Sequence, residues 1–309
     1  MLSTVPFEVP AYLIDKARRA PRLTMAVAGA GHPVAMESAR RAAEAGLMEP
    51  VLIGDAGAIA AIARDMDWNI AHLRVVAAGD ETGAAETAAR LARDGDAAAI
   101  MKGHVHTEAL MRAVLDRAAG LRTGRRISHV FHMTVPGRDR VMHITDGVIN
   151  VKPGIDDKID IVRNAVDLAH ALGTTEPRVA VLSGAETVNA AMPSSVEAAE
   201  VVKRANGGAV PGAVVDGPLS FDNAVSPEAA AIKGVDSPVA GRADILVVPN
   251  LESGNFLYKQ LVYFMSATAA GIVIGARVPI VLTSRADPPE ARLASAALAA
   301  IVAAERTPG

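Results

Sequence analysis

Short apolar runs alternate with segments of helical spacing along the N-terminal part of the chain. The first apolar run, residues 23–28, leads through Gly29 and Gly31 to Pro33 and a helical pattern over residues 35–47. The later strands are predicted at residues 50–54, 73–77 and 97–101, and the later helices at 58–64, 81–94 and 107–118, with Thr107 as the last helix's cap. Strands that alternate with helices in this way predict βαβ units and a mostly parallel sheet.

A second series of the same kind follows the basic segment 121–126, where we place a domain boundary. Its predicted strands are residues 128–134, 140–144, 178–182, 213–215, 244–248 and 278–283, and its predicted helices are 156–172, 195–205, a short one at Pro227 and the Ala-rich 288–304. The last helix carries few charges and needs a sheet to pack on. We expect that sheet to be the N-terminal one. Domain I would then be α/β and discontinuous, residues 1–125 plus 272–309, with residues 126–271 as α/β domain II.

Polar side chains collect after the last two predicted strands. Residues 244–248 lead into the segment 249–259, and residues 278–283 lead into Ser284-Arg285-Ala286-Asp287. In open α/β sheets, ligands bind at this edge. The segment 249–259 can be read simply as a helix start, but its backbone N–H groups, Asn255 and Lys259 could also surround an anion. A hydroxyl beside an arginine suits a phosphate or phosphoryl group.

Composition narrows the possible functions. The chain has 309 residues, half of them hydrophobic, and a net charge of −3, which argues against a general nucleic-acid binder. It has no cysteine, so thiolate nucleophiles, disulfides and cysteine metal sites are excluded. We see no signal peptide and no apolar segment of membrane-spanning length, and we therefore expect a soluble, cytoplasmic protein without a membrane partner.

Three other patterns leave alternatives open. Gly29 and Gly31 resemble half of a dinucleotide fingerprint, but the third glycine position holds Val34, so a glycine turn without NAD explains them. The pair His104-x-His106 lacks a recognisable third ligand, so no metal site is predicted. The segment 216–223 follows a predicted strand and reads equally well as a turn or as a wall of a site.

Five segments form an ordered series of their own. They are residues 50–55 (PVLIGD), 101–103 (MKG), 215–224 (VDGPLSFDNA), 240–244 (AGRAD) and 246–259 (LVVPNLESGNFLYK). Together they resemble the phosphate acetyl- and butyryltransferases, from about Thr24 to the C-terminus. Residues 257–264 (LYKQLVYF) and 281–287 (VLTSRAD) resemble the butyryl branch more than the acetyl branch.

This resemblance implies a reaction and an architecture. The reaction is the reversible transfer of an acyl group between coenzyme A and phosphate in a ternary complex, with CoA as a substrate and no tightly bound cofactor. The implied fold is two α/β domains like those of isocitrate and isopropylmalate dehydrogenases, with the site in an interdomain cleft, in a homodimer. The alternatives are a non-catalytic acyl-CoA-binding or regulatory protein and, less favoured, an NAD-dependent oxidoreductase on the same fold.

The resemblance also implies roles for single residues. Ser284 corresponds to a serine near the CoA thiol, Arg285 to a phosphate-binding arginine and Arg112 to a second anion-binding arginine. The family's aspartate base has no counterpart, because Ala291 and Arg292 fall near its place; Asp287 or Glu290 would have to replace it, or the thiolate would form with other help. The predicted substrate-binding residues are Arg112, Asp216, Asn250, Glu252, Gly254, Asn255, Tyr258 and Lys259.

Overall fold

The computed structural model describes residues 2–118, 121–284 and 286–306, which form an α/β fold. The chain divides into two compact units, and each is considered by itself. The central unit holds Arg126–Ala269 together with the residues before Phe7, and the terminal unit holds Phe7–Arg125 together with the chain from Ala270 onward.

A mixed sheet forms the middle of the terminal unit. Its strand order is β3-β2-β1-β4-β11-β10, in which only the β10–β11 pair is antiparallel. The strands are β1 (Leu23–Ala28), β2 (Met48–Gly54), β3 (Val75–Ala77), β4 (Ala99–Lys102), β10 (Thr268–Ile274) and β11 (Ile280–Val281). Strands β1, β4, β10 and β11 are almost wholly buried. For the parallel strands β1, β4 and β11 this is expected, because parallel sheets are covered on both faces.

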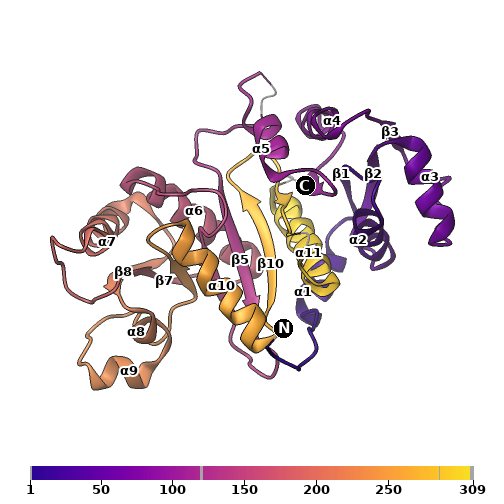
Figure 1. The fold of residues 1–309 in the computed structure, drawn as a ribbon. Coiled ribbons are helices and arrows are strands. Elements are labelled where there is room, and N and C mark those ends of the chain that lie inside the picture. Colours follow the sequence, from indigo (N-terminus) through magenta and orange to yellow (C-terminus); the bar gives the residue numbers. More distant parts are fainter. Residues whose placement is uncertain (1, 119–120, 285, 307–309) are drawn as a thin grey trace. The chain divides into compact units, whose positions relative to one another are not determined.

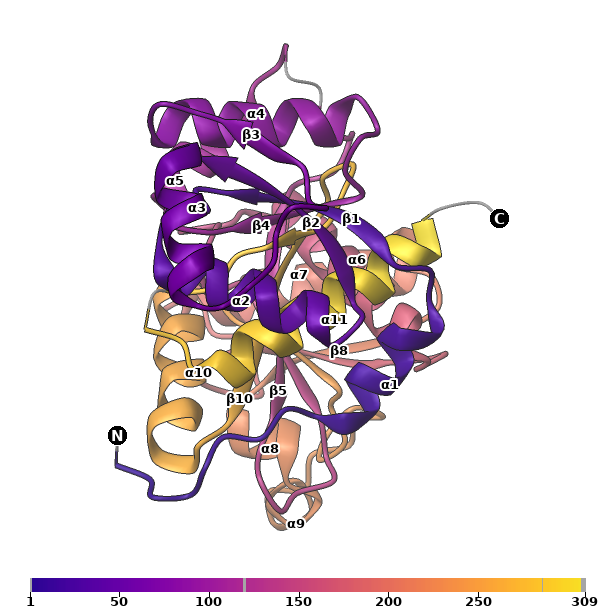
Figure 2. The ribbon, with the colours of Figure 1, turned by 90° about the vertical axis from the view of Figure 1, so that its right-hand side faces the viewer.

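Helices cover both faces of this sheet (Figure 2), with α4 on one side and α2 and α11 on the other. The helices of the unit are α1 (Ala11–Arg19), α2 (Pro33–Glu44), α3 (Ala56–Asp65), α4 (Glu81–Arg93), α5 (Thr107–Leu115) and α11 (Pro289–Arg306). The C-terminal helix α11 packs against β1, β4 and β11 and lies beside α1 and α2 (Figure 1), so it does find its sheet among the N-terminal strands.

Two predictions for this unit were wrong. Thr107 is the first helical residue of α5 rather than its cap; the cap position belongs to His106, whose side chain makes no capping bond. The strand predicted over residues 278–283 is only the two residues of β11, because Pro279 lies before it and the polar turn at Ser284 follows soon after.

The strands of the central unit are ordered β5-β6-β9-β7-β8, and among them β5 and β6 are antiparallel. Its strands are β5 (Ser128–Thr134), β6 (Met142–Thr145), β7 (Arg178–Leu182), β8 (Val214–Leu219) and β9 (Ile245–Val247). Its helices are α6 (Ile155–Leu172), α7 (Pro193–Arg204) with a π-helical turn at Ala205–Ala209, α8 (Phe221–Val225), α9 (Pro227–Ile232) and α10 (Leu251–Met265).

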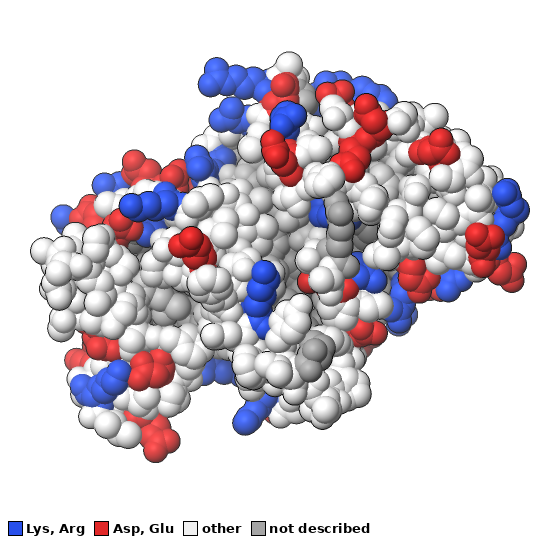
Figure 3. Space-filling view, viewed as in Figure 1, with Lys and Arg blue, Asp and Glu red and all other residues white. Residues whose placement is uncertain are grey.

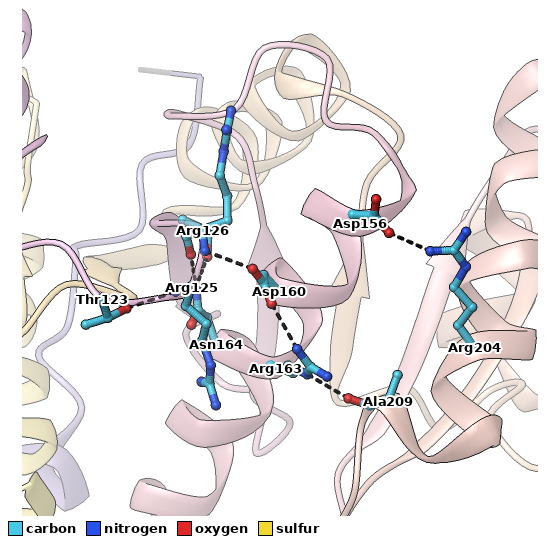
Figure 4. Close-up of polar contacts among 10 residues, drawn as sticks. Thr123, Arg125, Arg126, Asp156, Asp160, Arg163, Asn164, Arg204 and Ala209 are labelled. Atoms are coloured by element: carbon cyan, nitrogen blue, oxygen red, sulfur yellow. Dashed lines mark hydrogen bonds and ion pairs between the residues drawn. The ribbon is translucent and has the colours of Figure 1, made fainter.

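Charged side chains tie α6 to its surroundings (Figure 4). Asp156, at the start of α6, pairs with Arg204 at the end of α7, at 2.5 Å between Oδ1 and Nη1. Arg163 donates through Nε to the carbonyl oxygen of Ala209 at 2.6 Å and through Nη1 to Asp160 at 3.1 Å. These contacts hold α6 in place, and α6 in turn packs against β5 and β6.

Two histidines lie side by side in the sheet of the central unit. His132 of β5 and His143 of β6 are register partners, with Nδ1 and Nε2 at 3.1 Å, and both are buried. Burial lowers the pKa of His143 to about 4, although the Asp244 carbonyl opposes the shift. Burial and the neighbouring His143 hold the pKa of His132 well below its usual value. Both rings are therefore neutral in the folded protein at neutral pH.

We expect this pair to destabilise the fold in acid. The unfolded chain binds protons on both rings below about pH 6.5, whereas in the folded chain the pKa of His143 is about 4 and the pKa of His132 is also well below its usual value. The contribution of this pair to the free energy of unfolding is therefore fully present above about pH 6.5 and is lost as the pH drops toward 4. Urea denaturation across this range measures the slope. In His132→Asn/His143→Asn the slope should be shallower, and an unchanged slope would contradict the assignment.

Among the described residues, no helix is both long enough and apolar enough to cross a membrane.

Candidate functional site

In the central unit, polar groups gather at the carboxyl ends of β6 and β9. Asp146, directly after β6, is buried and accepts five hydrogen bonds. Its Oδ1 accepts from the N–H groups of Val148 and Ile149 at 2.8 and 2.9 Å. Its Oδ2 accepts from the His129 N–H at 3.1 Å and from the backbone and side chain of Asn150 at 3.3 and 2.7 Å. One carboxylate thus fixes the whole loop that follows β6.

The first turn of α10 rests on this loop. Asn250 caps the helix through Oδ1, which accepts from the Ser253 N–H at 2.9 Å and from its hydroxyl at 2.7 Å. Gly254 faces Gly147 so closely that a Cβ on Gly254 would lie 2.8 Å from the Gly147 Cα. Asn255 donates to the Gly147 carbonyl at 3.4 Å. Asn250, Gly254 and Asn255 therefore position the start of α10 at the sheet edge.

The other predicted residues of α10 separate into core and surface. Tyr258 is buried and stacks on Phe131 of β5, with ring centroids 3.9 Å apart, so its side chain belongs to the hydrophobic core. Glu252 and Lys259 are exposed. Sequence reasoning could not separate Tyr258 from its polar neighbours, because a tyrosine fits either place.

Asp216 lies in β8, partly buried, and its Oδ1 accepts a hydrogen bond from the N–H of Gly217 at 2.8 Å. Glu186, which follows β7, accepts hydrogen bonds from Ser220 and Asn223, which follow β8. Lys233 pairs with Asp222 at 2.9 Å. The segment 216–223 is thus both a turn and part of a polar network at the ends of β7 and β8.

The terminal unit contains a pocket of about 200 Å³ at the carboxyl ends of β1, β4 and β11. Its polar lining comes from four separate parts of the chain: His32 and Ser38 at and after the start of α2, Lys102 and His104 at and after the end of β4, Thr283 and Ser284 after β11, and Arg292 of α11. Lys102 is only 9 % exposed, and its Nζ donates to the Val105 carbonyl at 3.3 Å. The pocket therefore offers two cations, Lys102 and Arg292, and three hydroxyl groups, those of Ser38, Thr283 and Ser284.

The loops that carry the two histidines are packed backbone against backbone. Gly29 has a φ of +77°, and a Cβ on Gly103 would lie 2.6 Å from the Gly29 carbonyl oxygen. The His104 N–H also donates to that oxygen, at 2.9 Å. This close approach brings the His32 and His104 rings into a parallel stack, with centroids 4.0 Å apart and planes 5° from parallel.

Asp287 organises the turn that carries Ser284. The Ser284 N–H donates to the Asp287 carboxylate at 2.6 Å, and the Asp287 N–H donates to the Ser284 carbonyl at 3.2 Å. Glu290, in the first turn of α11, lies 3.9 Å from the guanidinium of Arg41. Arg285 lies outside the described residues.

Arg292 connects this turn to α2. It donates to the Asp287 carbonyl oxygen and, through Nε, to the Ser38 hydroxyl at 2.9 Å. Burial lowers the pKa of its guanidinium, and Asp287 opposes that shift. Arg292 stands near the place where the resemblance implies an aspartate, so the chain puts a positive group there.

Arg112 lies in a different hollow, between α4 and α5. There it lines a cavity of about 420 Å³ with Arg90, Arg93 and Asp116. Its side chain is 71 % exposed and pairs with Glu108 at 2.6 Å. Arg112 does not line the pocket that contains Ser284.

Sequence reasoning missed several lining residues of the Ser284 pocket. Lys102 lies in the Met101-Lys102-Gly103 segment, but the sequence assigns it no function. His32 lies just before the predicted helix, and no motif marks it as a functional residue. Only the fold brings them beside Ser284, since their segments are far apart along the chain.

The His104-x-His106 pair does not form a metal site. His106 bonds Glu81 at 2.6 Å, whereas His104 stacks on His32. Within the described part of the chain, no group of three histidines or acidic residues is arranged to hold a metal ion.

Polar and charged groups at the carboxyl ends of parallel strands, in each unit, are typical of ligand-binding α/β proteins. The family described as "Phosphate acetyl/butaryl transferase" matches residues 80–300. The chain belongs to this family.

Three known proteins illustrate the relationship. A phosphate acetyltransferase of Rhizobium meliloti is 50% identical over 95% of this chain and 93% of its own. A phosphate butyryltransferase of Clostridium beijerinckii is 40% identical over 94% and 97%. The crystal structure of a branched-chain phosphotransacylase from Enterococcus faecalis V583 superimposes with a TM-score of 0.80, at 34% identity, over 91% of this chain and 99% of its own. The acetyltransferase is more similar to this chain than the butyryltransferase is, although residues 257–264 and 281–287 resemble the butyryl branch. Sequence identity alone therefore does not assign the length of the acyl group.

Proposed function

We propose that this protein is an acyltransferase that moves a short acyl group, acetyl to butyryl, reversibly between coenzyme A and inorganic phosphate. The family relationship supports the reaction, and the pocket beside Ser284 is the observation that supports its location. Because the chain has no cysteine, no acyl-cysteine intermediate can form, which favours direct transfer in a ternary complex.

The charges of the pocket suit the reaction. Attack on the carbonyl carbon of the acyl group creates a negatively charged tetrahedral intermediate, and the phosphate group is anionic throughout. Lys102 and Arg292 supply fixed positive charge at a partly desolvated place, where it stabilises such species more than it would in water. The Ser284 hydroxyl can donate a hydrogen bond to the thiol or to the phosphate.

We also propose the wider arrangement that the resemblance implies. The two compact units are taken as the two domains of an isocitrate/isopropylmalate dehydrogenase-like enzyme, and residues of both take part in the reaction. In this proposal, α10 and Asp216 help to bind CoA or acyl phosphate, Arg112 binds an anionic group, and Arg285 binds phosphate. The enzyme is a cytoplasmic homodimer whose CoA is a substrate, with no tightly bound cofactor and no nucleic-acid or membrane partner.

One assay separates this function from its alternatives. Purified protein is given acetyl-, propionyl- or butyryl-CoA, and thiol release is followed with and without phosphate. Phosphate-dependent release at a catalytic rate supports the acyltransferase. Tight acyl-CoA binding without release would favour a non-catalytic acyl-CoA-binding protein, and NAD reduction with a hydroxy acid would favour the oxidoreductase.

Asp287 and Glu290 remain candidates for the base that removes the thiol proton, but the contacts give each another task. Asp287 accepts from the Ser284 N–H, and Glu290 faces Arg41. We therefore expect Asp287→Asn and Glu290→Gln to lower kcat/KM by less than about tenfold, below the usual effect of losing a general base. Initial rates of thioester formation measure this. A hundredfold loss in either variant, with a changed pH profile, would identify that carboxylate as the base.

A further inference from the structure

The pocket of the terminal unit is lined by two groups of suitable basicity that the proposed function does not yet use. An imidazole nitrogen can accept a proton near neutral pH, and two imidazoles, His32 and His104, line the pocket with Ser284. The carboxylate nearest to Ser284, that of Asp287, already accepts the Ser284 N–H. The choice of base therefore turns to the histidine pair.

The two rings are not equivalent. His32 is the N-cap of α2, and its Nδ1 accepts a hydrogen bond from the Val34 N–H at 3.2 Å. That lone pair is occupied, so the ring proton of neutral His32 is on Nε2, and His32 acts as a donor. His104 is more exposed than His32 and lies on the loop directly after Lys102. Its greater exposure makes His104 the ring of the pair that a substrate can reach.

The surroundings of His104 suit a general base that is neutral before the reaction and positively charged only while it holds the transferred proton. The charged or titratable groups around it are His32 ahead of α2, Lys102 of β4, Arg292 of α11, Glu81 of α4 and His106 of its own loop. Two positive charges on stacked rings repel each other, so a positive charge on one ring disfavours a second on its neighbour. Glu81, whose carboxylate interacts with His104 as well as with His106, attracts the proton once it arrives.

Resting on the proposed function, we propose that His104 takes the proton of the CoA thiol, with His32 as the positioning residue that holds its ring by stacking. The S–H proton moves to a ring nitrogen of His104 while sulfur bonds to the carbonyl carbon of the acyl phosphate. The tetrahedral intermediate then breaks its carbon–oxygen bond to phosphate, and His104 returns the proton to the departing phosphate. Nothing else is consumed, and the reverse reaction uses the same steps.

The glycines explain how the chain keeps this geometry. Gly29 and Gly103 let the two loops touch without side chains between them, so the backbone from which each ring projects is fixed by close packing. A base that is already in place needs no rearrangement when the substrates bind.

The test is a pH series on His104→Gln, with His106→Gln as the matched control from the same loop. Thioester formation from CoA is followed with acetyl phosphate and with butyryl phosphate. His104→Gln should lower kcat/KM about a hundredfold near neutral pH. The deficit should shrink by about tenfold for each pH unit above that, because free thiolate then replaces the base. His106→Gln should stay close to wild type at every pH.

The outcomes separate the two proposals. If wild-type protein makes no thioester from either acyl phosphate, the proposed function fails. If the wild type is active and His104→Gln keeps its rate, or loses the same factor at every pH, His104 is not the base. His104→Asn, compared with His104→Gln in thermal unfolding and in the same pH series, shows whether a change in the loop rather than in the base causes the loss.

Discussion

Replacing Lys102 by methionine is expected to lower kcat/KM by about a hundredfold or more. Lys102 is the nearly buried cation at the end of β4, and it lines the pocket beside Ser284. Loss of one preorganised group that stabilises transition-state charge usually costs 10²–10³-fold in rate, about 3–4 kcal/mol. Methionine is also unbranched and of similar length, so the loss should come from the charge rather than from packing. Steady-state kinetics in both directions measure it.

The matched control for this change is Lys203→Met. Lys203 lies on α7 in the other unit, with its side chain 79 % exposed, and pairs only loosely with Glu200 at 3.7 Å. That variant should keep wild-type kinetics. Lys102→Arg keeps the charge and should recover part of the rate. If Lys102→Met stays within about threefold of wild type, the pocket does not use Lys102 to bind the anionic groups.

Gly254→Ala is expected to destabilise the protein, although alanine is the better helix former. Glycine to alanine inside a helix normally stabilises by up to about 1 kcal/mol. Here the added methyl group would lie 2.8 Å from the Gly147 Cα and 3.0 Å from the Val248 side chain. Backbone cannot yield as a flexible side chain does, so α10 must move and the net cost should be about 1–3 kcal/mol. Urea denaturation gives the difference.

If α10 binds the substrate as proposed, kcat/KM should also fall by about tenfold or more in Gly254→Ala, since a displacement of about 1 Å can cost up to 10²-fold. Gly207→Ala is the control, because nothing lies within 4 Å of the added methyl. It should leave the free energy of unfolding unchanged or raise it by up to about 1 kcal/mol. A Gly254→Ala protein as stable as Gly207→Ala would show that the two glycines do not need to be this close.

The alternation of apolar runs and helices predicted most of the secondary structure, because the parallel strands are buried on both faces and stand out from their surroundings. Strands β5 and β7 begin and end where they were expected. Strand β10 was missed, although all of its residues are buried. Its sequence, Thr-Ala-Ala-Gly-Ile-Val-Ile, has three residues of weak strand preference, Ala-Ala-Gly, after its first position, and only two residues separate it from the end of α10. Local preference therefore did not mark where the helix stops.

The candidate site was harder to predict, for a different reason. A motif is a continuous segment, and the segment 249–259 mixes residues of three kinds: a helix cap at Asn250, a close backbone contact at Gly254 and a core ring at Tyr258. The pocket beside Ser284 takes single residues from four places along the chain. Its composition depends on strand order, which short-range patterns do not contain.

Asp146 gives the central unit a property that hydrogen exchange can measure. The amide protons of His129, Val148, Ile149 and Asn150 share one acceptor group. We expect exchange of any one of these amide protons to need the Asp146 carboxylate to move into water. That movement breaks the hydrogen bonds of the other three amides as well. The four amides should therefore exchange with similar protection, as one cooperative unit, and the loop under α10 should open as a whole or remain closed.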